Sequence, residues 1–291
     1  MPRPTKRSRA APESILETLI ERIDERQGDK LAPDTLPTGF ASLDRILAGG
    51  LRRKDLVVLA GDVGSGKSAL GLAVAVRAAG AHIPTMFFSG EMSPDRVLER
   101  ALALEGRVAI DEMRQGRVDD VARASVGAAA VRLRNSSLVV RPLLGGEFDE
   151  IRTALDIVPR RQLLIVDSLQ LTAPPRSAAR LEERVALAIR ALKALAVERD
   201  VAVLVTAQLP NHRANRPDPR PTLDDLGGFG AVKQNADVVL MLYREEMYRP
   251  GQGVEGATEL IVAKNRNGPT GFVDLYFYPR WLRFVDMLDA D

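Results

Sequence analysis

The sequence predicts an α/β fold in which a mainly parallel sheet is flanked by helices and extended at its edge by antiparallel strands. Three observations favour it. Short apolar runs alternate with amphipathic helical patterns between residues 55 and 208. A glycine-rich motif joins the first of these runs to the helix that follows. Beyond residue 209 come apolar strand-like runs without intervening helices. Continuous apolar runs are typical of parallel strands that are buried on both faces.

The composition is that of an ordinary globular protein, with 291 residues, 45% of them hydrophobic and 27% charged. The absence of cysteine excludes disulfides and thiolate metal sites. His82 and His212 are the only histidines, and they are too far apart to suggest a metal site. We find neither the apolar core of a signal peptide nor a stretch of transmembrane length. The sequence therefore predicts a soluble, cytoplasmic protein with no membrane partner.

Residues 1–11 form a basic tail that carries four cations and no acid. The net charge of the whole chain is only +2, so the remainder is slightly acidic. The tail is too polar and too rich in proline to pack, and we expect it to be disordered. A basic tail can contact nucleic acid. A solvated terminus without a specific role explains the pattern equally well.

Residues 12–35 are predicted to form an amphipathic linker helix followed by a linker. Ser14 and Glu17 match a capping box, and residues 28–40 are rich in Gly, Pro and Asp. The apolar residues at helical spacing are Leu16, Leu19, Ile20 and Ile23. This stripe must pack on something, either on its own domain or on a neighbouring subunit.

Residues 36–291 form the main predicted domain. Its short apolar runs predict strands within residues 55–61, 82–90, 136–142, 161–171 and 201–208. Amphipathic spacing predicts helices within residues 64–80, 93–104, 148–158 and 179–200. The later runs, residues 236–244, 257–264 and 271–279, are predicted to be antiparallel additions to the edge of the sheet.

The stretch GDVGSGKS, residues 61–68, matches G-x-x-x-x-G-K-[ST] between a strand and a helix. Its glycines let backbone N–H groups surround a phosphate, and the helix N-terminus adds positive potential. Lys67 would reach the β- and γ-phosphates of ATP, and Ser68 would ligate Mg²⁺. The alternative is a chance glycine-rich turn. The nucleotide-binding residues predicted here are Gly61, Gly64, Ser65, Gly66, Lys67 and Ser68.

Three further polar residues follow apolar strands, where open parallel sheets bind their ligands. Asp167 ends the run LLIVD, and such an acid assists Mg²⁺ binding in P-loop proteins. Glu91, in FFSGEMS, is placed to orient and deprotonate a water molecule, although a solvated helix-capping acid is the alternative. Gln208 ends VTAQ, where its amide could sense the γ-phosphate, a role that this position alone does not decide.

Two cations, Lys264 and Arg266, stand two residues apart in KNRNGPTG. Alternate residues share one face of a strand, so both side chains should point the same way. The Asn-Gly-Pro sequence predicts a sharp turn immediately after them. We expect the strand that carries them to lie at the edge of the sheet. The pair suggests an anion ligand; a solvated basic hairpin is the alternative.

Taken together and in order, SGEMS, LLIVDSLQL, LAIRALKALAVERDVAVLVTAQLPN, QNADVVLMLYREE and AKNRNGPTG resemble the C-terminal motor domain of DnaB-type replicative helicases. The resemblance implies a RecA-like P-loop NTPase. It begins near residues 36–51 and runs almost to the end of the chain. AKNRNGPTG is the most specific motif, because generic P-loop proteins lack it. We expect the N-terminal domain of the family to be absent here.

The resemblance implies a homo-oligomer, a hexameric ring with ATP at the subunit interfaces. Lys264 and Arg266 match a Lys and an Arg that reach the γ-phosphate on the neighbouring subunit. The helix within residues 12–27 resembles the helix that docks on an adjacent subunit in that family. Tyr243 and Arg244 would lie near the nucleotide base. The expected partners are single-stranded DNA, the other subunits and a possible loader protein.

One segment departs from the family. In the loop that lines its central pore the family has an Arg-Glu pair, but this chain has Gly227 and Gly228 within DDLGGFGAVKQNAD. The N–H groups of a glycine-rich loop can still bind phosphate, and Phe229 could stack on a base. Lys233 could replace the missing cation. The DNA-binding residues predicted here are Gly227, Gly228, Phe229, Gly230 and Lys233.

The sequence therefore predicts an ATP hydrolase that translocates on single-stranded DNA and unwinds duplex during replication. The main alternative is a non-motor RecA-fold ATPase, RadA- or KaiC-like, that remodels a partner, and the altered pore loop favours it. A nucleotide-gated DNA scaffold is a second alternative, against which the set Lys67, Glu91 and Asp167 argues. A small-molecule kinase is a third, in which cations supplied by a neighbour would have no purpose.

Overall fold

The computed structural model describes residues 16, 17, 20, 32, 34–143, 148–157, 162–172, 180–210, 216–228, 230–251 and 254–288. The chain divides into two units, Met1–Thr35 and Leu36–Asp291. In the first unit Leu16 and Ile20 are helical and exposed. The predicted basic tail, and Leu19 and Ile23 of the predicted stripe, lie outside the described residues.

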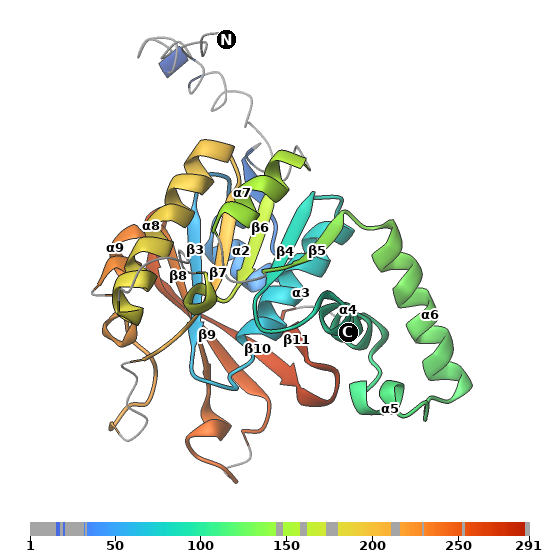
Figure 1. The fold of residues 1–291 in the computed structure, drawn as a ribbon. Helices are drawn as coiled ribbons and strands as arrows, with labels where there is room; N and C mark the ends of the chain where they lie inside the picture. Colours follow the sequence, from blue (N-terminus) through green and yellow to red (C-terminus); the bar gives the residue numbers. More distant parts are fainter. Residues whose placement is uncertain are drawn as a thin grey trace, which may run out of the picture. The chain divides into compact units, whose positions relative to one another are not determined.

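A nine-stranded sheet, formed by described residues, organises the second unit (Figure 1). Its order is β11-β10-β9-β8-β3-β7-β6-β4-β5, and a second, two-stranded sheet pairs β1 with β2. The strands are β1 (Thr35–Leu36), β2 (Leu51–Arg52), β3 (Leu56–Gly61), β4 (Thr85–Ser89), β5 (Leu138–Pro142), β6 (Leu163–Asp167), β7 (Ala202–Gln208), β8 (Val238–Arg244), β9 (Ala257–Asn265), β10 (Gly271–Tyr278) and β11 (Arg283–Asp286). From β8 to β5 the strands are parallel, and β9, β10 and β11 are antiparallel to their neighbours.

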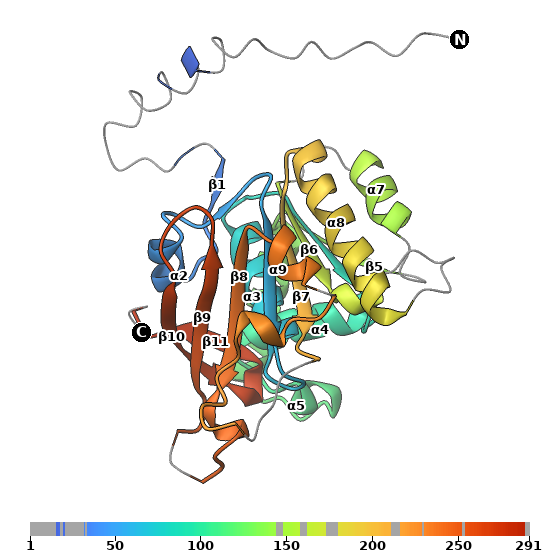
Figure 2. The same ribbon diagram turned by 90° about the vertical axis from the view of Figure 1, so that its left-hand side faces the viewer.

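Helices cover both faces of this sheet (Figures 1 and 2). The α-helices are α2 (Ala41–Ile46), α3 (Lys67–Gly80), α4 (Pro94–Gly106), α5 (Ile110–Arg114), α6 (Asp120–Asn135), α7 (Phe148–Ile157), α8 (Leu181–Arg199) and α9 (Ala231–Asn235). The short 3₁₀ turns are η1 (Leu169–Leu171), η2 (Leu223–Asp225), η3 (Glu245–Met247) and η4 (Pro279–Trp281). On β3, Val57 and Leu59 pack in the core beneath α3, whereas Leu56 and Val58 pack in the core beneath α8.

The predicted alternation of strands and helices is confirmed, and so is the antiparallel character of β9 and β10. The prediction for β8 is wrong, because β8 pairs in parallel with β3, Val57 opposite Val238. The reason is the long connection over residues 209–237, which returns the chain to the starting end of β3. Parallel neighbours need a crossover of about a dozen residues or more.

The sequence did not predict α5, α6 or β11. α6, all of whose residues are described, fully buries only Ala129, while Val126 and Leu133, on the same side of the helix, are half-buried. Its start is fixed locally, since the Ala122 N–H donates to the Asp119 side chain at 2.7 Å. In the described part of the chain, no helix combines the length and the apolar character that crossing a bilayer requires.

The carboxylate of Asp286 ties β11 to α2. It is 1% exposed and accepts hydrogen bonds from the Ser42 N–H and the Ser42 hydroxyl, each at 2.6 Å. Asp286→Ala should lower the free energy of unfolding by about 2–4 kcal/mol, because the half-buried N–H and hydroxyl of Ser42 lose a charged acceptor. Urea unfolding measures the loss. Asp274→Ala, which removes an exposed carboxylate from β10, should change it by less than about 0.5 kcal/mol. Equal effects of the two substitutions would contradict the anchoring role.

Candidate nucleotide-binding site

The loop between β3 and α3 requires its glycines. Gly64 and Gly66 have φ angles of 78° and 102°, in the left-handed region that disfavours other residues. A Cβ atom on Gly61 would lie 2.6 Å from the Ser65 hydroxyl oxygen. The chain therefore turns sharply out of β3 and enters α3 at Lys67, so that the start of this helix faces the turn.

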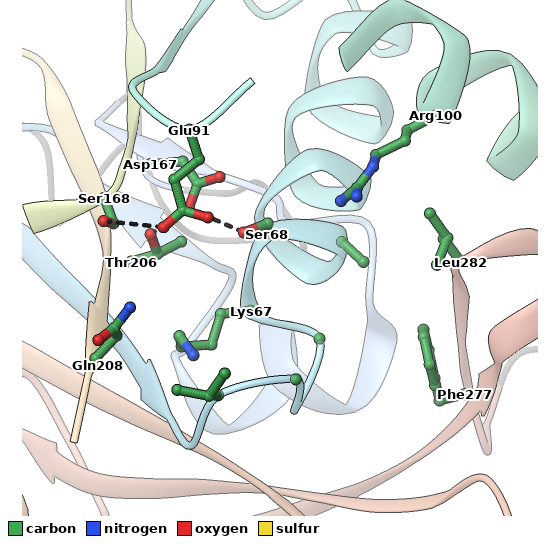
Figure 3. Close-up of a pocket in the computed structure, with 14 residues that line it drawn as sticks. Lys67, Ser68, Glu91, Arg100, Asp167, Ser168, Thr206, Gln208, Phe277 and Leu282 are labelled. Atoms are coloured by element: carbon green, nitrogen blue, oxygen red, sulfur yellow. Dashed lines mark hydrogen bonds between the residues drawn. The ribbon is translucent and has the colours of Figure 1, made fainter. Parts of the chain in front are cut away.

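A cavity of about 290 Å³ opens beside this loop, at the carboxyl ends of the parallel strands (Figure 3). Lys67, Ser68, Glu91, Asp167 and Gln208, all predicted from the sequence, line it. The other lining residues are Val63, Gly64, Gly66, Ala69, Arg100, Ser168, Thr206, Phe277 and Leu282. The structure thus brings the five predicted residues together from four separate segments of the sequence.

The carboxylate of Asp167 lies at the base of the cavity and is 1% exposed. Its Oδ1 accepts hydrogen bonds from the Ser68 hydroxyl at 3.0 Å and the Thr206 hydroxyl at 2.5 Å. Its Oδ2 is buried and has no hydrogen-bond partner among the described residues. An unsatisfied carboxylate oxygen beside a hydroxyl fits Mg²⁺, which takes one or two protein oxygens together with phosphate and water.

Lys67 projects its ammonium group into the same cavity, where it donates to the Asp62 carbonyl at 2.8 Å. Burial lowers the pKa of Lys67, while the charges of Asp167, Asp62 and Glu91 act in the opposite direction. A partly desolvated cation gains most from a ligand that carries negative charge. The cavity is therefore suited to a phosphate group.

Glu91 and Gln208 complete the polar side of the cavity. Glu91 follows β4 and is exposed, and its carboxylate accepts a 3.4 Å hydrogen bond from the Ser168 hydroxyl. The turn beneath it is fixed, because the Gly90 N–H donates to the Asp167 carbonyl at 2.6 Å. Gln208 is exposed at the end of β7. Both side chains can therefore contact a ligand and the water around it.

Sequence reasoning missed several lining residues. Thr206 stands two positions before Gln208, and strand alternation could have placed both on one face. Arg100 is part of the amphipathic pattern of α4, which by itself predicts only a surface helix. Phe277 and Leu282 come from β10 and the turn after it, far from the glycine-rich motif in sequence. No local pattern indicates their position.

Arg244 and Tyr243 occupy different surroundings. The Arg244 guanidinium donates to the Gly64 carbonyl at 3.3 Å and lies 4.5 Å from the centre of the Phe277 ring, next to the cavity. The Tyr243 ring is 1% exposed, stacks on Tyr248 at 5.3 Å and lines a separate cavity of about 200 Å³. Only Arg244 of the two therefore lies beside the glycine-rich loop.

Lys264 and Arg266 lie at the opposite end of the sheet from this cavity. They point the same way, as predicted: Lys264 donates to the carbonyl groups of Lys233 and Ala236, and Arg266 to the side chain of Asp237. The expected position at the sheet edge is wrong, because β10 and β11 lie outside β9. Arg266 adjoins Asp237, before β8, whereas Gly61 pairs with Leu242 near its other end. Asp237 and Leu242 are five residues apart, so at about 3.3 Å per residue Arg266 and Gly61 lie about 16 Å apart along the sheet.

The predicted DNA-binding loop is partly closed against α8. Gly227 and Gly228 are buried, and the Gly228 N–H donates to the Glu182 carboxylate. The expectation that this N–H group is free for phosphate therefore does not hold in this structure. The reason is that a carboxylate from the first turn of α8 already occupies it.

The remaining residues of that loop differ in their surroundings. Phe229 lies outside the described residues. Gly230 is the N-cap residue before α9 and has a φ angle of 77°. The Lys233 ammonium forms an ion pair at 2.8 Å with the exposed carboxylate of Asp224, and its side chain is 42% exposed. Lys233 is thus the described cation of the loop that an external ligand could reach.

The sheet order, the glycine-rich loop and the buried acid opposite it define a P-loop protein with a RecA-like fold. The chain matches the model of the DnaB-like helicase C terminal domain family over residues 35–286 and belongs to that family. It is similar to the replicative DNA helicase DnaB of Leifsonia xyli subsp. xyli (strain CTCB07), with 35% identity over 280 residues, 94% of this chain and 61% of that protein. It is also 32% identical to the replicative DNA helicase DnaC of Bacillus subtilis (strain 168), over 92% of this chain and 59% of that protein.

Solved structures agree with this assignment. One solved ATPase domain superposes with a TM-score of 0.87 and 26% identity, covering 96% of this chain and 100% of that one. A DnaB-like replicative helicase, described with its interactions with primase, gives a TM-score of 0.85 and 27% identity, covering 96% of this chain and 68% of that one. The predicted family and fold class are confirmed. The chain spans only about three fifths of the curated relatives' length.

Thr206→Val should lower the free energy of unfolding of the nucleotide-free protein by about 1–3 kcal/mol, because it removes a donor from a buried carboxylate. Urea denaturation without nucleotide measures the change. Thr258→Val is the matched control, since Thr258 is also a buried strand residue but donates to a neutral carbonyl, that of Gly256, at 3.0 Å. A loss no larger than that of Thr258→Val would mean that Thr206 does not stabilise the charge of Asp167.

Proposed function

We propose that this chain is the ATP-hydrolysing motor domain of a ring-forming DnaB-type replicative helicase, working on single-stranded DNA in the cytoplasm. One observation carries the proposal: two groups of residues, each of which would supply part of an ATP site, lie at opposite ends of one sheet. The glycine-rich loop and Asp167 lie at one end, and Lys264 and Arg266 at the other. A chain built in this way completes the site only when a second copy supplies the missing half.

In the first half, the N–H groups of residues 61–68 and the ammonium of Lys67 would hold the β- and γ-phosphates. Ser68 and Asp167 would hold Mg²⁺, which offsets the charge that develops on the phosphates. Glu91 would orient the attacking water and accept its proton. Gln208, exposed at the end of the neighbouring strand, would contact the γ-phosphate, and Arg244 would lie toward the base.

In the second half, Lys264 and Arg266 of one copy would enter the cavity of the next. Extra cations near the γ-phosphate stabilise the transition state for phosphoryl transfer more than they stabilise bound ATP. Repetition of the same contact would close a ring, and the resemblance described above implies six copies. Residues 36–291 would form the motor, and the helix within residues 12–35 would dock on an adjacent subunit.

The DNA contact is proposed for the loop over residues 224–233, with Lys233 as its accessible cation. A second candidate function is a non-motor ATPase of the same fold. It is favoured by the burial of Gly227 and Gly228 and by the Glu182 carboxylate on the Gly228 N–H group. The two candidates differ in whether single-stranded DNA changes the rate of ATP hydrolysis.

Adding single-stranded DNA should raise the steady-state rate of ATP hydrolysis by the assembled protein. In a separate test of the general base, Glu91→Gln should lower kcat by about 10²–10⁴-fold. Phosphate release, the equilibrium affinity for ATP and the mass of the assembly are measured together. Glu91→Gln should leave ATP affinity nearly unchanged, whereas Lys67→Ala should weaken it. A ring that hydrolyses ATP at the same rate with and without DNA would instead support the non-motor ATPase.

Mixing two inactive variants tests the shared site. Arg266→Ala should lower turnover by about 10³-fold or more with little change in ATP affinity, because the arginine acts in the transition state. Mixed rings of Arg266→Ala and Lys67→Ala chains should regain part of the activity, since some interfaces then pair two intact halves. Arg280→Ala, which removes a cation that is 65% exposed, is the control and should keep normal turnover. No recovery in verified mixed rings would place Arg266 and Lys67 in the same half of the site.

A further inference from the structure

A buried carboxylate lies directly behind the pair of cations. Asp237 is 5% exposed and precedes β8. Its Oδ1 accepts a hydrogen bond from the Arg266 guanidinium at 3.0 Å. Its Oδ2 accepts from the Lys193 ammonium at 2.5 Å and from the Leu56 N–H at 2.8 Å. Both oxygens are thus engaged, and each holds a different part of the molecule.

Backbone carbonyl groups around Asp237 also accept hydrogen bonds from Arg266 and Lys264. Arg266 donates from its second terminal nitrogen to the Gln234 carbonyl at 2.6 Å, and its own N–H donates to the Asp237 carbonyl at 2.9 Å. Lys264 donates to the carbonyls of Lys233 and Ala236 at 2.5 and 2.6 Å. Three of these acceptors, the carbonyls of Lys233, Gln234 and Ala236, belong to the end of α9, where carbonyl groups lack helical partners and carry partial negative charge.

This arrangement fixes the Arg266 guanidinium without hiding it. The Asp237 side chain is 7% exposed, whereas that of Arg266 is 48% exposed. Asp237 also accepts from Lys193, so its single charge is shared by two cations, and Asp55 is a second carboxylate near enough to interact with Asp237 and Lys193. A guanidinium carries five N–H donors, and those on its outer side remain available to a ligand. The same cation can therefore be held by its own chain and offered to another.

We propose that Asp237 is the positioning residue that orients Arg266 toward the nucleotide of the neighbouring copy. The inference rests on the proposed function of Arg266. An arginine side chain turns about several bonds, and a displacement of about 1 Å at a reacting centre can lower a rate by about 10²-fold. The two-sided attachment to Asp237 and Gln234 removes this freedom before the subunits meet.

A competing explanation places the action of Asp237 within its own chain. Through the Leu56 N–H it contacts the start of β3, the strand that leads into the glycine-rich loop. A disturbance passed along β3 would damage the cavity of the same subunit. The two explanations assign Asp237 to different halves of the ATP site, and mixed rings distinguish them.

The primary variant is Asp237→Asn, which keeps the size of the side chain and an acceptor oxygen but removes the charge that attracts Arg266. It should lower kcat for ATP hydrolysis by about 10–100-fold with little change in KM, the pattern of a displaced transition-state group. Lys193→Met is the matched control, because it removes the other ion-pair partner of Asp237 and leaves Arg266 attached. It should keep kcat within about twofold of the unchanged chain. An equal fall in both variants would make Asp237 a structural residue and overturn the proposal.

Mixing supplies the decisive measurement. Asp237→Asn chains should regain activity with Lys67→Ala chains and should not regain it with Arg266→Ala chains. The reverse pattern would place the defect in the glycine-rich half and overturn the inference. Mixed rings of Lys67→Ala with Arg266→Ala report on the shared site separately: if these fail to recover, it is the proposed function that fails.

Folding is monitored throughout by urea unfolding and by the mass of the assembly. Should Asp237→Asn not assemble, Asp237→Glu provides a second test, because it keeps the charge but displaces it by one methylene group. It should fall in the same complementation class, with a smaller loss of kcat. If neither variant forms folded rings, Asp237 is required for folding and its assignment as a positioning residue is overturned.

Discussion

The burial of β3 on both faces is the constraint on which the rest of the structure depends. Helices cover it from either side, and β7 and β8 hold its two edges, so no charged group can lie along its length. Charged residues can stand only where such a strand ends. The glycine-rich loop follows one end of β3. At the other end, the Asp237 N–H donates to the Leu56 carbonyl, and the Asp237 carboxylate accepts from the Leu56 N–H. The polar chemistry of the domain is thus divided between two ends of one sheet.

This division explains how much of the fold the sequence could predict. A strand buried on both faces is a continuous apolar run, and LVVLA, LLIVD and VVLML are each such a run, so the sequence predicts these central strands. Strand direction is a different matter. β8 looks the same in sequence whether it runs parallel or antiparallel to β3, because the path of residues 209–237 decides it. α6 is harder to predict, because the residues on its packed side, Ala122, Val126, Ala129 and Leu133, form only a weakly apolar stripe and Ala129 alone is fully buried.

The sequence predicts those residues of the candidate site that belong to the glycine-rich motif or stand at the end of a parallel strand. Residues 61–68 and the ends of β4, β6 and β7 have to meet once the sheet forms, so Lys67, Glu91 and Asp167 could be placed together. Arg100 and Phe277 reach the cavity through packing between distant elements, which no local pattern records. The partners of Gly228 could not be foreseen either, since Glu182 belongs to a helix far away in sequence.

The two buried glycines of that loop also limit how the protein can change. A Cβ atom on Gly227 would lie 2.8 Å from Pro210 and 3.0 Å from the Glu182 carboxylate, and one on Gly228 would lie 2.9 Å from Val185. Gly228 in addition has a φ angle of 74°. A larger residue at Gly228 therefore requires Val185 of α8 to shift, whereas one at Gly227 requires Pro210 and the end of the Glu182 side chain to move. Larger side chains in this loop therefore call for changes at its neighbours, Val185 on α8 and Pro210 after β7, and a graft from a relative would have to carry these neighbours with it.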